Sequence, residues 1–434
     1  MTKIVFLCKG SRGDVQPLLA IAVNYKDHHP SDEVVVACTP SVASGFSFLL
    51  HTGIQFFSLP DVEQMLVQDY TAACALACSG GKMDLLRRET SACLQASEGA
   101  SLIVFNLFTL EGYFIAQYLN VPCLAASPFL QTRTMPSTFE AMLSEAQPGL
   151  YKKLRDARHG EVSFAEVDHW MWRLFLNDFS DICEALHIPS LPFSTPTGLL
   201  PPPVPLLYGV SPLIVQRQSY WPNSVELTGY WTLPESLQEP PHPDLVSLLS
   251  TSQPLYIGFG SMEAYLGDIN WSSILERFEN VLKSFNLIGL FQCTPGGRVE
   301  TAYRQLLWTP TCVRLWAGPL PHSWLFSRCC AVLHHGGSGT VATALLAKKP
   351  QVICPVMFDQ QYWAEQLSWE GLAVQCPGPD KLTETDLTTA LNVLFKSKMA
   401  ETAYTVSSRL EHEDGVTLAV TRMEGLLREG RVET

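Results

Sequence analysis

The sequence predicts an α/β protein built from two Rossmann-like domains, and three observations support this. Short apolar runs recur along both halves of the chain, each followed by a glycine-containing turn and a helical stretch. Hydrophobic residues make up 47% of the chain and charged residues 16%, as expected for parallel sheets that are covered on both faces. The length of 434 residues exceeds that at which a single core usually keeps growing, so two domains of roughly 200 residues are expected.

The first half of the chain repeats a strand, turn and helix pattern. Its first unit has a buried strand at Ile4 to Cys8, a turn, and a helix at Leu18 to Tyr25. Further strands are expected at Val34 to Cys38, Leu102 to Phe105 and Cys123 to Ala126. Helical stretches between them predict a mostly parallel sheet with both faces covered.

A proline-rich stretch at residues 188 to 205 separates the two halves, because so many prolines prevent a helix or a central strand. We therefore expect a first domain at 1–205 and a second at 206–410. Residues 411–434 are expected to form an amphipathic helix, since apolar residues recur there at helical spacing. Either domain is open as its packing partner, and packing back on the first domain is one of these two alternatives. In the second domain, strands are expected at Leu255 to Phe259, Leu287 to Phe291, Cys312 to Leu315, Ala331 to Leu333 and Val352 to Cys354.

The formal net charge of −13 argues against a nucleic-acid-binding protein, because phosphate neutralisation needs clustered Lys and Arg. The apolar stretch at the N-terminus is too short for a signal peptide. The most apolar region, Leu102 to Leu130, is interrupted by polar residues and does not reach the ~18 apolar residues of a spanning helix. A cytoplasmic protein without a transmembrane segment is therefore expected.

The strongest local signal is AVLHHGGSGTVATALLAKKP, in which an apolar strand ends at His334 and a glycine-rich turn leads into a helix. The N-terminus of a helix presents backbone amide donors and the positive end of the helix dipole, so it accommodates an anion. The turn is neither a Walker A motif nor a G-x-G-x-x-G motif. Taken alone, it is also compatible with a tight turn that binds nothing.

A second signal, KGSRGDVQP, directly follows the first strand and contains Asp14, with Pro17 placed for the first helical turn. Asp14 is a candidate general base, and helix capping is the competing interpretation. Two weaker signals lie in the second half. Ser261 lies in IGFGSM at 257–262, where a hydroxyl can meet a phosphate, although this is also a common turn. Asp359 and Gln360 offer a carboxylate and an amide to vicinal hydroxyls, although such dipeptides are often surface turns or caps.

Together these pieces resemble the sterol glucosyltransferase branch of the family-1 UDP-glycosyltransferases, in the family's order and over nearly the whole chain. The matching stretches are GSRGDVQP at 10–17, VPLLYGVSPLIV at 204–215, ELTGYW at 226–231, PLYIGFGSM at 254–262, PHSWLF at 321–326 and HHGGSGTVATALLAKKPQVICPVMFDQQYWAEQL at 334–367. The resemblance implies the GT-B fold, with two Rossmann-like domains whose parallel sheets face a cleft. It also implies an inverting transfer of a hexose from a UDP-sugar, UDP-glucose above all, without a metal or another cofactor.

The resemblance also implies roles for individual residues. Asp14 matches the acceptor base, and Asp359 and Gln360 match residues that hold the donor sugar. The residues matched to the donor diphosphate are Ser11, Arg12, Gly13, Ser261, His334, Gly337, Ser338, Gly339 and Thr340.

The nucleoside site departs from the pattern of many relatives. These carry a tryptophan two residues before a Pro-Gln pair, whereas alignment of Pro321 and His322 with that pair places Pro319 at the tryptophan position. Pro321 and His322 are the candidates for nucleoside contact.

The implied acceptor is a sterol or a similar hydrophobic molecule, which would require transient contact with a membrane. Aromatic residues in 127–143 and 169–179 suit such an acceptor, and an ordinary core is the alternative. Two other functions stay open from the sequence: a non-catalytic protein that binds a nucleotide-sugar or a lipid, and a GT-B enzyme that glycosylates a phenolic, polyketide or peptide acceptor.

Overall fold

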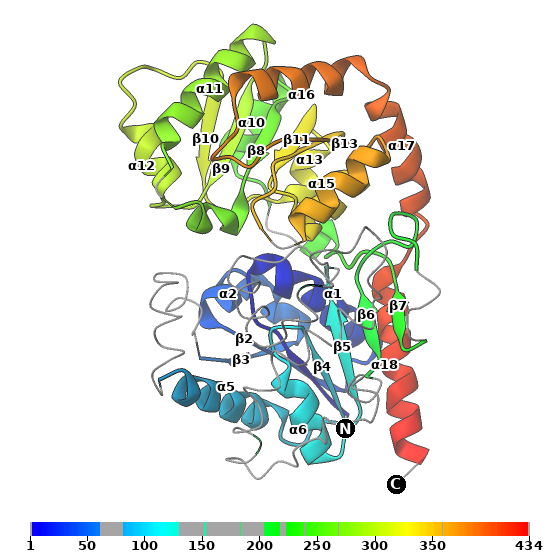
Figure 1. Cartoon of the computed structure of the whole chain (residues 1–434). Helices are drawn as coiled ribbons and strands as arrows, with labels where there is room; N and C mark the ends of the chain where they lie inside the picture. The colour runs from blue at the N-terminus through cyan, green and yellow to red at the C-terminus, as the bar shows by residue number, and fades with distance from the viewer. Residues whose placement is uncertain are drawn as a thin grey trace. The chain divides into compact units, whose positions relative to one another are not determined.

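The computed structural model describes residues 2–60, 81–129, 152, 183, 204–217, 223–237, 240–267, 269–357 and 359–432. The chain divides into two compact units (Figure 1). The first comprises Met1–Leu237 together with Glu413–Thr434, and the second comprises Gln238–His412. Among the described residues, each unit contains one sheet whose strands are all paired in parallel. The predicted α/β architecture with two Rossmann-like domains is therefore confirmed.

The first sheet has the strand order β3-β2-β1-β4-β5-β6-β7 among the described residues. The domain boundary expected after residue 205 lies too early in the sequence, because two short strands beyond it pair with the first sheet. The strands are β1 (Lys3–Leu7), β2 (Glu33–Cys38), β3 (Gln55–Ser58), β4 (Leu102–Phe105), β5 (Cys123–Ser127), β6 (Leu206–Tyr208) and β7 (Val225–Leu227).

Helices cover both faces of the first sheet. Alternate strand residues such as Ile4 and Phe6 face α1 and the C-terminal helix α18, where they share one apolar core. On the other face Gly112 of α6 packs so closely that an added Cβ would lie 2.7 Å from Cβ of Phe105. The helices of this unit are α1 (Arg12–His28), α2 (Pro40–Ser44), η1 (Ser47–Thr52), α5 (Gly81–Ser97), α6 (Glu111–Leu119), η2 (Glu235–Leu237) and α18 (Gly415–Val432).

Helix α1 begins earlier than the sequence predicted. It starts at Arg12, so Pro17 lies inside the helix and not in its first turn. Pro17 has no amide to donate to the carbonyl of Gly13, but Gly13 is exposed and that carbonyl can bond to water. A capping arrangement at Ser11 fixes the early start.

Helix α18 belongs to the first unit, although it is the last element of the chain. Met423 is fully buried in the core that α18 shares with α1. Two polar contacts hold its exposed side: His29 Nε2 lies 2.8 Å from Glu424 Oε1, and Arg422 lies 2.8 Å from Glu226. The first unit is therefore completed by a segment that follows the whole second unit in sequence.

The second sheet has the strand order β10-β9-β8-β11-β12-β13 among the described residues. Its order reverses between β8 and β11, and ligands of open α/β sheets bind beyond the carboxyl ends of the strands at such a point. The strands are β8 (Leu255–Gly258), β9 (Gly289–Cys293), β10 (Val313–Ala317), β11 (Ala331–His334), β12 (Gln351–Ile353) and β13 (Ala373–Gln375).

The two faces of this sheet have separate cores. One core contains side chains of α11, α12 and α16, and the other contains side chains of α10, α13 and α14. Residues along β8 alternate between them, with Ile257 in the first and Tyr256 in the second. The helices are α10 (Pro243–Thr251), η3 (Gly260–Tyr265), α11 (Trp271–Ser284), α12 (Arg298–Arg304), α13 (His322–Phe326), α14 (Ser338–Leu346), α15 (Gln360–Trp369), α16 (Glu384–Lys396) and α17 (Met399–Leu410).

A buried carboxylate fixes the segment that enters β10. Glu279 of α11 accepts hydrogen bonds from the backbone amides of Thr311, Cys312 and Val313, at 2.8 to 3.1 Å. Burial alone would raise the pKa of Glu279, but these bonds and one from the Thr311 hydroxyl lower it. Glu279 therefore holds the start of β10 as a charged group.

Within the described part of the chain, none of the helices combines the length and the apolar character needed to cross a bilayer. Of the aromatic segments expected to suit the acceptor, 127–143 and 169–179, all but residues 127–129 lie outside the described residues.

Candidate functional site

The loops that follow β8, β11 and β12 carry the candidate residues of the second unit. These three strands are neighbours, with β11 paired to β8 on one side and to β12 on the other. Because all three run in parallel, their carboxyl ends lie at one edge of the sheet. The structure thus brings Ser261, the turn after His334, and the pair Asp359 and Gln360 to the same edge, as the motifs predicted.

His334 is fully buried at the end of β11, and both of its ring nitrogens have protein partners. Nδ1 accepts a hydrogen bond of 3.0 Å from the amide of Gly336, and Nε2 lies 2.8 Å from Oε1 of Gln351. Burial lowers the pKa of His334 to about 3, so the ring is neutral and Nε2 carries its proton. In this structure the ring therefore fixes the glycine turn and does not reach outward to an anion, in contrast to the direct diphosphate contact that the resemblance implies.

The neighbouring His335 was not among the sequence candidates. Its ring lies between two glycine-containing loops: an added Cβ on Gly337 would lie 2.5 Å from its Nε2, and one on Gly260 would lie 3.1 Å from its Cε1. Burial lowers the pKa of His335 to about 4, so this ring is also neutral. Among the described residues its buried Nδ1 has no hydrogen-bond partner. The paired histidines HH in the sequence were the only signal for it.

The glycine turn leads directly into the nine-residue helix α14. Gly337 is its N-cap residue, and no described side chain caps the helix. Gly336 has a φ of +92°, and an added Cβ would lie 2.8 Å from Ile353 and 3.1 Å from the carbonyl of Gln360, so only glycine fits. Because both histidines are neutral, the positive potential at this edge comes from the amides and the dipole of α14.

Ser338, Gly339 and Thr340 form the first turn of α14. Ser338 is buried, whereas Gly339 is exposed and has open space where a Cβ would be. Ser261 lies at the start of η3 and is also exposed.

Asp359 and Gln360 are both buried at the start of α15. Oε1 of Gln360 accepts hydrogen bonds from the amides of Val356 and Met357, at 2.8 and 3.0 Å. Oδ2 of Asp359 accepts a bond of 2.6 Å from the indole of Trp363. These contacts hold the loop between β12 and α15, which is the turn-forming role that the sequence left open for the two residues.

Pro321 and His322 lie at the start of α13, which follows β10. In the strand order, β10 is on the other side of β8 from β11 and β12. His322 Nε2 lies 2.8 Å from Oε1 of Gln292, whose amide donates to the carbonyl of Gly318 at 2.8 Å. The ring of His322 also stacks on Phe326. His322 thus anchors the loop after β10, and Gln292 is a further polar residue at this edge that the motifs did not reveal.

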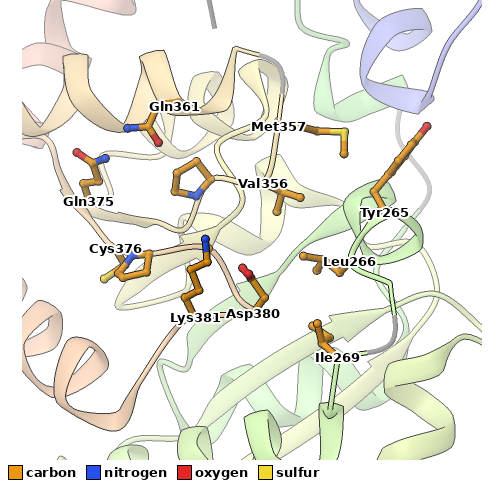
Figure 2. A pocket seen from close by; sticks show the side chains of 13 residues that line it. Tyr265, Leu266, Ile269, Val356, Met357, Gln361, Gln375, Cys376, Asp380 and Lys381 are labelled. Carbon is orange, nitrogen blue, oxygen red and sulfur yellow. The ribbon is translucent and has the colours of Figure 1, made fainter. Parts of the chain in front are cut away.

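A cavity of about 820 Å³ opens beside this edge of the second sheet (Figure 2). Segments after β8, β12 and β13 line it, and their polar lining residues include Gln361, Gln375, Asp380 and Lys381. The candidate residues of the donor motifs are not among its lining residues.

In the first unit, Ser11 and Asp14 form a capping box at the start of α1. The amide and the hydroxyl of Ser11 donate to Oδ2 of Asp14, at 2.6 and 2.8 Å, and Oγ of Ser11 accepts from the amide of Gly13 at 3.2 Å. The N-cap is therefore Ser11, and Asp14 is its partner in the box. Burial outweighs the two bonds from Ser11 and raises the pKa of Asp14 to about 6.

Gly10 allows this close arrangement. It has a φ of +107°, and an added Cβ would lie 2.5 Å from Oδ2 of Asp14. Arg12 is exposed, with its guanidinium 4.9 Å from the ring centre of Phe46.

A buried charged cluster lies directly before this turn. Nζ of Lys9 is 2.7 Å from Glu89 and 3.5 Å from Glu111, while the Lys9 carbonyl accepts a bond of 2.7 Å from Asn106. Burial lowers the pKa of Lys9, but attraction to the two carboxylates is stronger and raises it above its usual value. The cluster ties α5 and α6 to the end of β1. It could not be predicted from the sequence, because its members are far apart along the chain.

Among the described residues, no three His, Cys, Asp or Glu side chains are grouped as a metal site would require.

Comparison with known proteins places these features in a family context. Residues 300–416 match the family model described as "Erythromycin biosynthesis protein CIII-like, C-terminal domain". Two sterol 3-beta-glucosyltransferases of Arabidopsis thaliana are 27% and 28% identical to the chain, over 96% of it and over 64% and 67% of their own length. A UDP-sugar-dependent glycosyltransferase of Dictyostelium discoideum is 25% identical over 96% of the chain and 26% of its own length. The chain thus spans between about a quarter and two thirds of the length of these curated relatives.

Solved structures show the same fold. The glycotransferase of kitacinnamycin superposes with a TM-score of 0.67 at 17% identity, covering 98% of this chain and 99% of that one. The calicheamicin glycosyltransferase CalG4 gives a TM-score of 0.65 at 16% identity and covers 98% of both chains. The fold is therefore GT-B. Within that class, the predicted resemblance to the sterol 3-beta-glucosyltransferase branch of family 1 is confirmed over 96% of the chain.

Proposed function

We propose that this chain is an inverting, metal-independent glycosyltransferase that moves a hexose from a UDP-sugar to a hydroxyl of a hydrophobic acceptor, with a sterol as the acceptor and glucose as the sugar. The observation that carries the proposal is the glycine turn that ends in the uncapped N-terminus of α14. It supplies amide donors for a diphosphate without a cation. The similarity to sterol 3-beta-glucosyltransferases along the chain supports the acceptor class.

The proposed donor site uses the sheet edge described above. The diphosphate is assigned to the first turn of α14, Gly337 to Thr340, and to Ser261. His334 acts through the turn that it holds, because both of its nitrogens are bonded within the protein. Ser11, Arg12 and Gly13 are assigned to the diphosphate on the resemblance alone, and Asp359 and Gln360 to the sugar. Pro321 and His322 are assigned to the nucleoside.

In the proposed reaction, Asp14 takes the proton of the acceptor hydroxyl as that oxygen attacks the anomeric carbon, and UDP leaves from the opposite face. A pKa of about 6 makes Asp14 a stronger base at neutral pH than an ordinary aspartate. Both bonds from Ser11 reach Oδ2, so we assign the proton to Oδ1. The dipole and amides of α14 stabilise the charge that develops on the leaving diphosphate.

Gly339→Ala tests the donor site. The added methyl would enter open space on the exposed side of the first turn of α14, so the fold should tolerate it, while a bound diphosphate would meet it. We expect UDP affinity, measured by calorimetry, to fall at least about tenfold, equivalent to ~1.4 kcal/mol. The matched control is Gly425→Ala in α18, which also has open space for a Cβ. Unchanged UDP affinity in Gly339→Ala would refute the assignment of the diphosphate to this turn.

A product assay separates the candidate functions. The wild-type protein is incubated with UDP-glucose, other UDP-sugars and dTDP-glucose, together with sterol, phenolic and polyketide acceptors, and products are detected by mass. Transfer to sterols supports the proposal, whereas transfer only to the other acceptors overturns the sterol assignment. UDP binding without transfer to any acceptor indicates a non-catalytic binding protein.

A further inference from the structure

Two cysteines stand side by side at the carboxyl ends of neighbouring strands in the second sheet. Ile353 of β12 is in register with Gln375 of β13, so Cys354 and Cys376 form the next pair. The amide of Cys376 donates a hydrogen bond of 2.8 Å to the carbonyl of Ile353. Neighbouring strands lie about 4.8 Å apart, and the Cα atoms of a disulfide are usually ~4.4–6.8 Å apart. The backbone is therefore already spaced for a disulfide.

The two side chains also lie on the same face of the sheet. Both belong to the core that contains α11 and α16. The Cys354 thiol donates a hydrogen bond to the sulfur of Cys376, and this bond lowers the pKa of Cys376 while it raises that of Cys354. The thiolate is the nucleophilic form of cysteine. The lowered pKa and the greater exposure of Cys376, at 6% against 0% for Cys354, both favour Cys376 as the attacking group of the pair.

Access to the two sulfurs differs. Cys354 is fully buried, whereas Cys376 is 6% exposed and lines the 820 Å³ cavity (Figure 2). Lys381 and Asp380 also line this cavity, so it carries one group of each charge. A small reagent would thus reach Cys376 first.

We propose that Cys354 and Cys376 form a modification site that reacts with a low-molecular-weight disulfide, such as glutathione disulfide, and closes to an intramolecular disulfide. The Cys376 thiolate attacks one sulfur of the reagent, whose S–S bond breaks and releases one thiolate, which takes a proton from water. Cys354 then loses its proton to water, attacks the Cys376 sulfur and releases the second thiol. The two protein thiols lose two electrons, and the reagent is reduced to two thiols.

The chain contains a matched control pair in its first unit. Leu7 of β1 is in register with Ala37 of β2, so Cys8 and Cys38 are paired in the same way, and the Cys8 amide donates to the Ala37 carbonyl at 2.9 Å. Both cysteines share one core and are fully buried. Burial raises the pKa of Cys38 to about 12 and that of Cys8 well above its usual value. Cys8 and Cys38 therefore have the same backbone spacing as Cys354 and Cys376, but neither sulfur is accessible and neither pKa is lowered.

The test treats the folded full-length protein with glutathione disulfide, blocks the remaining thiols with N-ethylmaleimide and maps the peptides by mass spectrometry. We expect a Cys354–Cys376 cross-link that dithiothreitol reverses, formed at least about tenfold faster than any Cys8–Cys38 cross-link. Equal rates for the two pairs, or no Cys354–Cys376 cross-link, would overturn the proposal.

Two variants test the order of the steps. Cys354→Ser should stop at a glutathione adduct on Cys376, and Cys376→Ser should leave Cys354 unmodified. A glutathione adduct on Cys354 in the second variant would contradict the assigned attacking group. Cys354→Ala and Cys376→Ala serve the same purpose if the serine variants unfold, since they bury no hydroxyl.

Discussion

Nε2 of His334 donates a hydrogen bond of 2.8 Å to Oε1 of Gln351, which joins the end of β11 to the start of β12. With the bond from Gly336 to Nδ1, it leaves the imidazole neutral and fully engaged. The glycine turn is therefore held in place by a histidine that is buried in the protein interior.

His334→Asn should lower stability and weaken UDP binding, because a shorter side chain cannot reach both partners and leaves a buried polar group unpaired, at ~1–3 kcal/mol. The folded pKa of about 3 lies below the unfolded value of 6.5, so the histidine's contribution is fully present above pH 6.5 and is lost as the pH falls toward 3. The stability difference between wild type and variant should thus shrink by ~1 kcal/mol per pH unit below 6.5. Urea unfolding at pH 7.5 and 5.5 measures this. A difference that grows at low pH would contradict it.

Asp14→Asn should lower kcat by about 10²-fold or more while UDP affinity stays unchanged, because it removes a base but leaves an oxygen to accept the Ser11 bonds. The raised folded pKa means that protonation of Asp14 favours folding, so its contribution is present below pH 3.8 and is lost as the pH rises through about 6. Asn should therefore be tolerated at pH 8. Turnover and urea unfolding measure these effects, with Asp27→Asn, on the exposed end of the same helix, as the control. Full turnover in Asp14→Asn would show that the residue only caps the helix.

Glu279→Ala should lower the free energy of unfolding by about 3 kcal/mol, because three backbone amides before and within β10 lose their acceptor. Glu276→Ala is the control, since Glu276 is exposed on the same helix. The lowered pKa of Glu279 makes its contribution present above pH 4.5 and lost as the pH falls through the folded pKa. Urea unfolding at pH 7 and pH 4 should show a smaller difference from wild type at pH 4.

Lys9→Met should lower the free energy of unfolding by ~3–5 kcal/mol, because it leaves the buried carboxylates of Glu89 and Glu111 without their cation. The matched triple variant Lys9→Met/Glu89→Gln/Glu111→Gln removes all three charges and should recover most of that loss. Urea denaturation of the wild type, of Lys9→Met and of the triple variant measures both effects. A triple variant less stable than Lys9→Met would show that charge is not the cause.

The sequence predicted the long-range plan of the fold well, because buried parallel strands are continuous apolar runs. The expected strand at Leu102 to Phe105 matches β4 in full. Strands β6 and β7, of three residues each, were not among the predicted strands. Their pairing with the first sheet is what moves the unit boundary to Leu237.

The site residues could be predicted where a local sequence pattern marks them, as the glycines mark the turn after His334. It was not predictable where a partner is distant in sequence. Nothing near His334 indicates that Gln351 would occupy its Nε2, and nothing near Lys9 indicates Glu89. Such contacts depend on which strands and helices become neighbours. The assigned roles of Asp14, Asp359 and Gln360 stay predictions.

Helix α18 belongs to the first unit but is made after the whole second unit, and this order has a consequence for biosynthesis. When His412 has just been added to the chain, the synthesis of Gln238–His412 is complete, but Ala419 and Met423 of the first core have not been made. The nascent first unit then exposes to solvent the apolar side of α1 that α18 covers in the folded protein. We therefore expect chaperones to bind the nascent protein during the interval before α18 is available to cover α1.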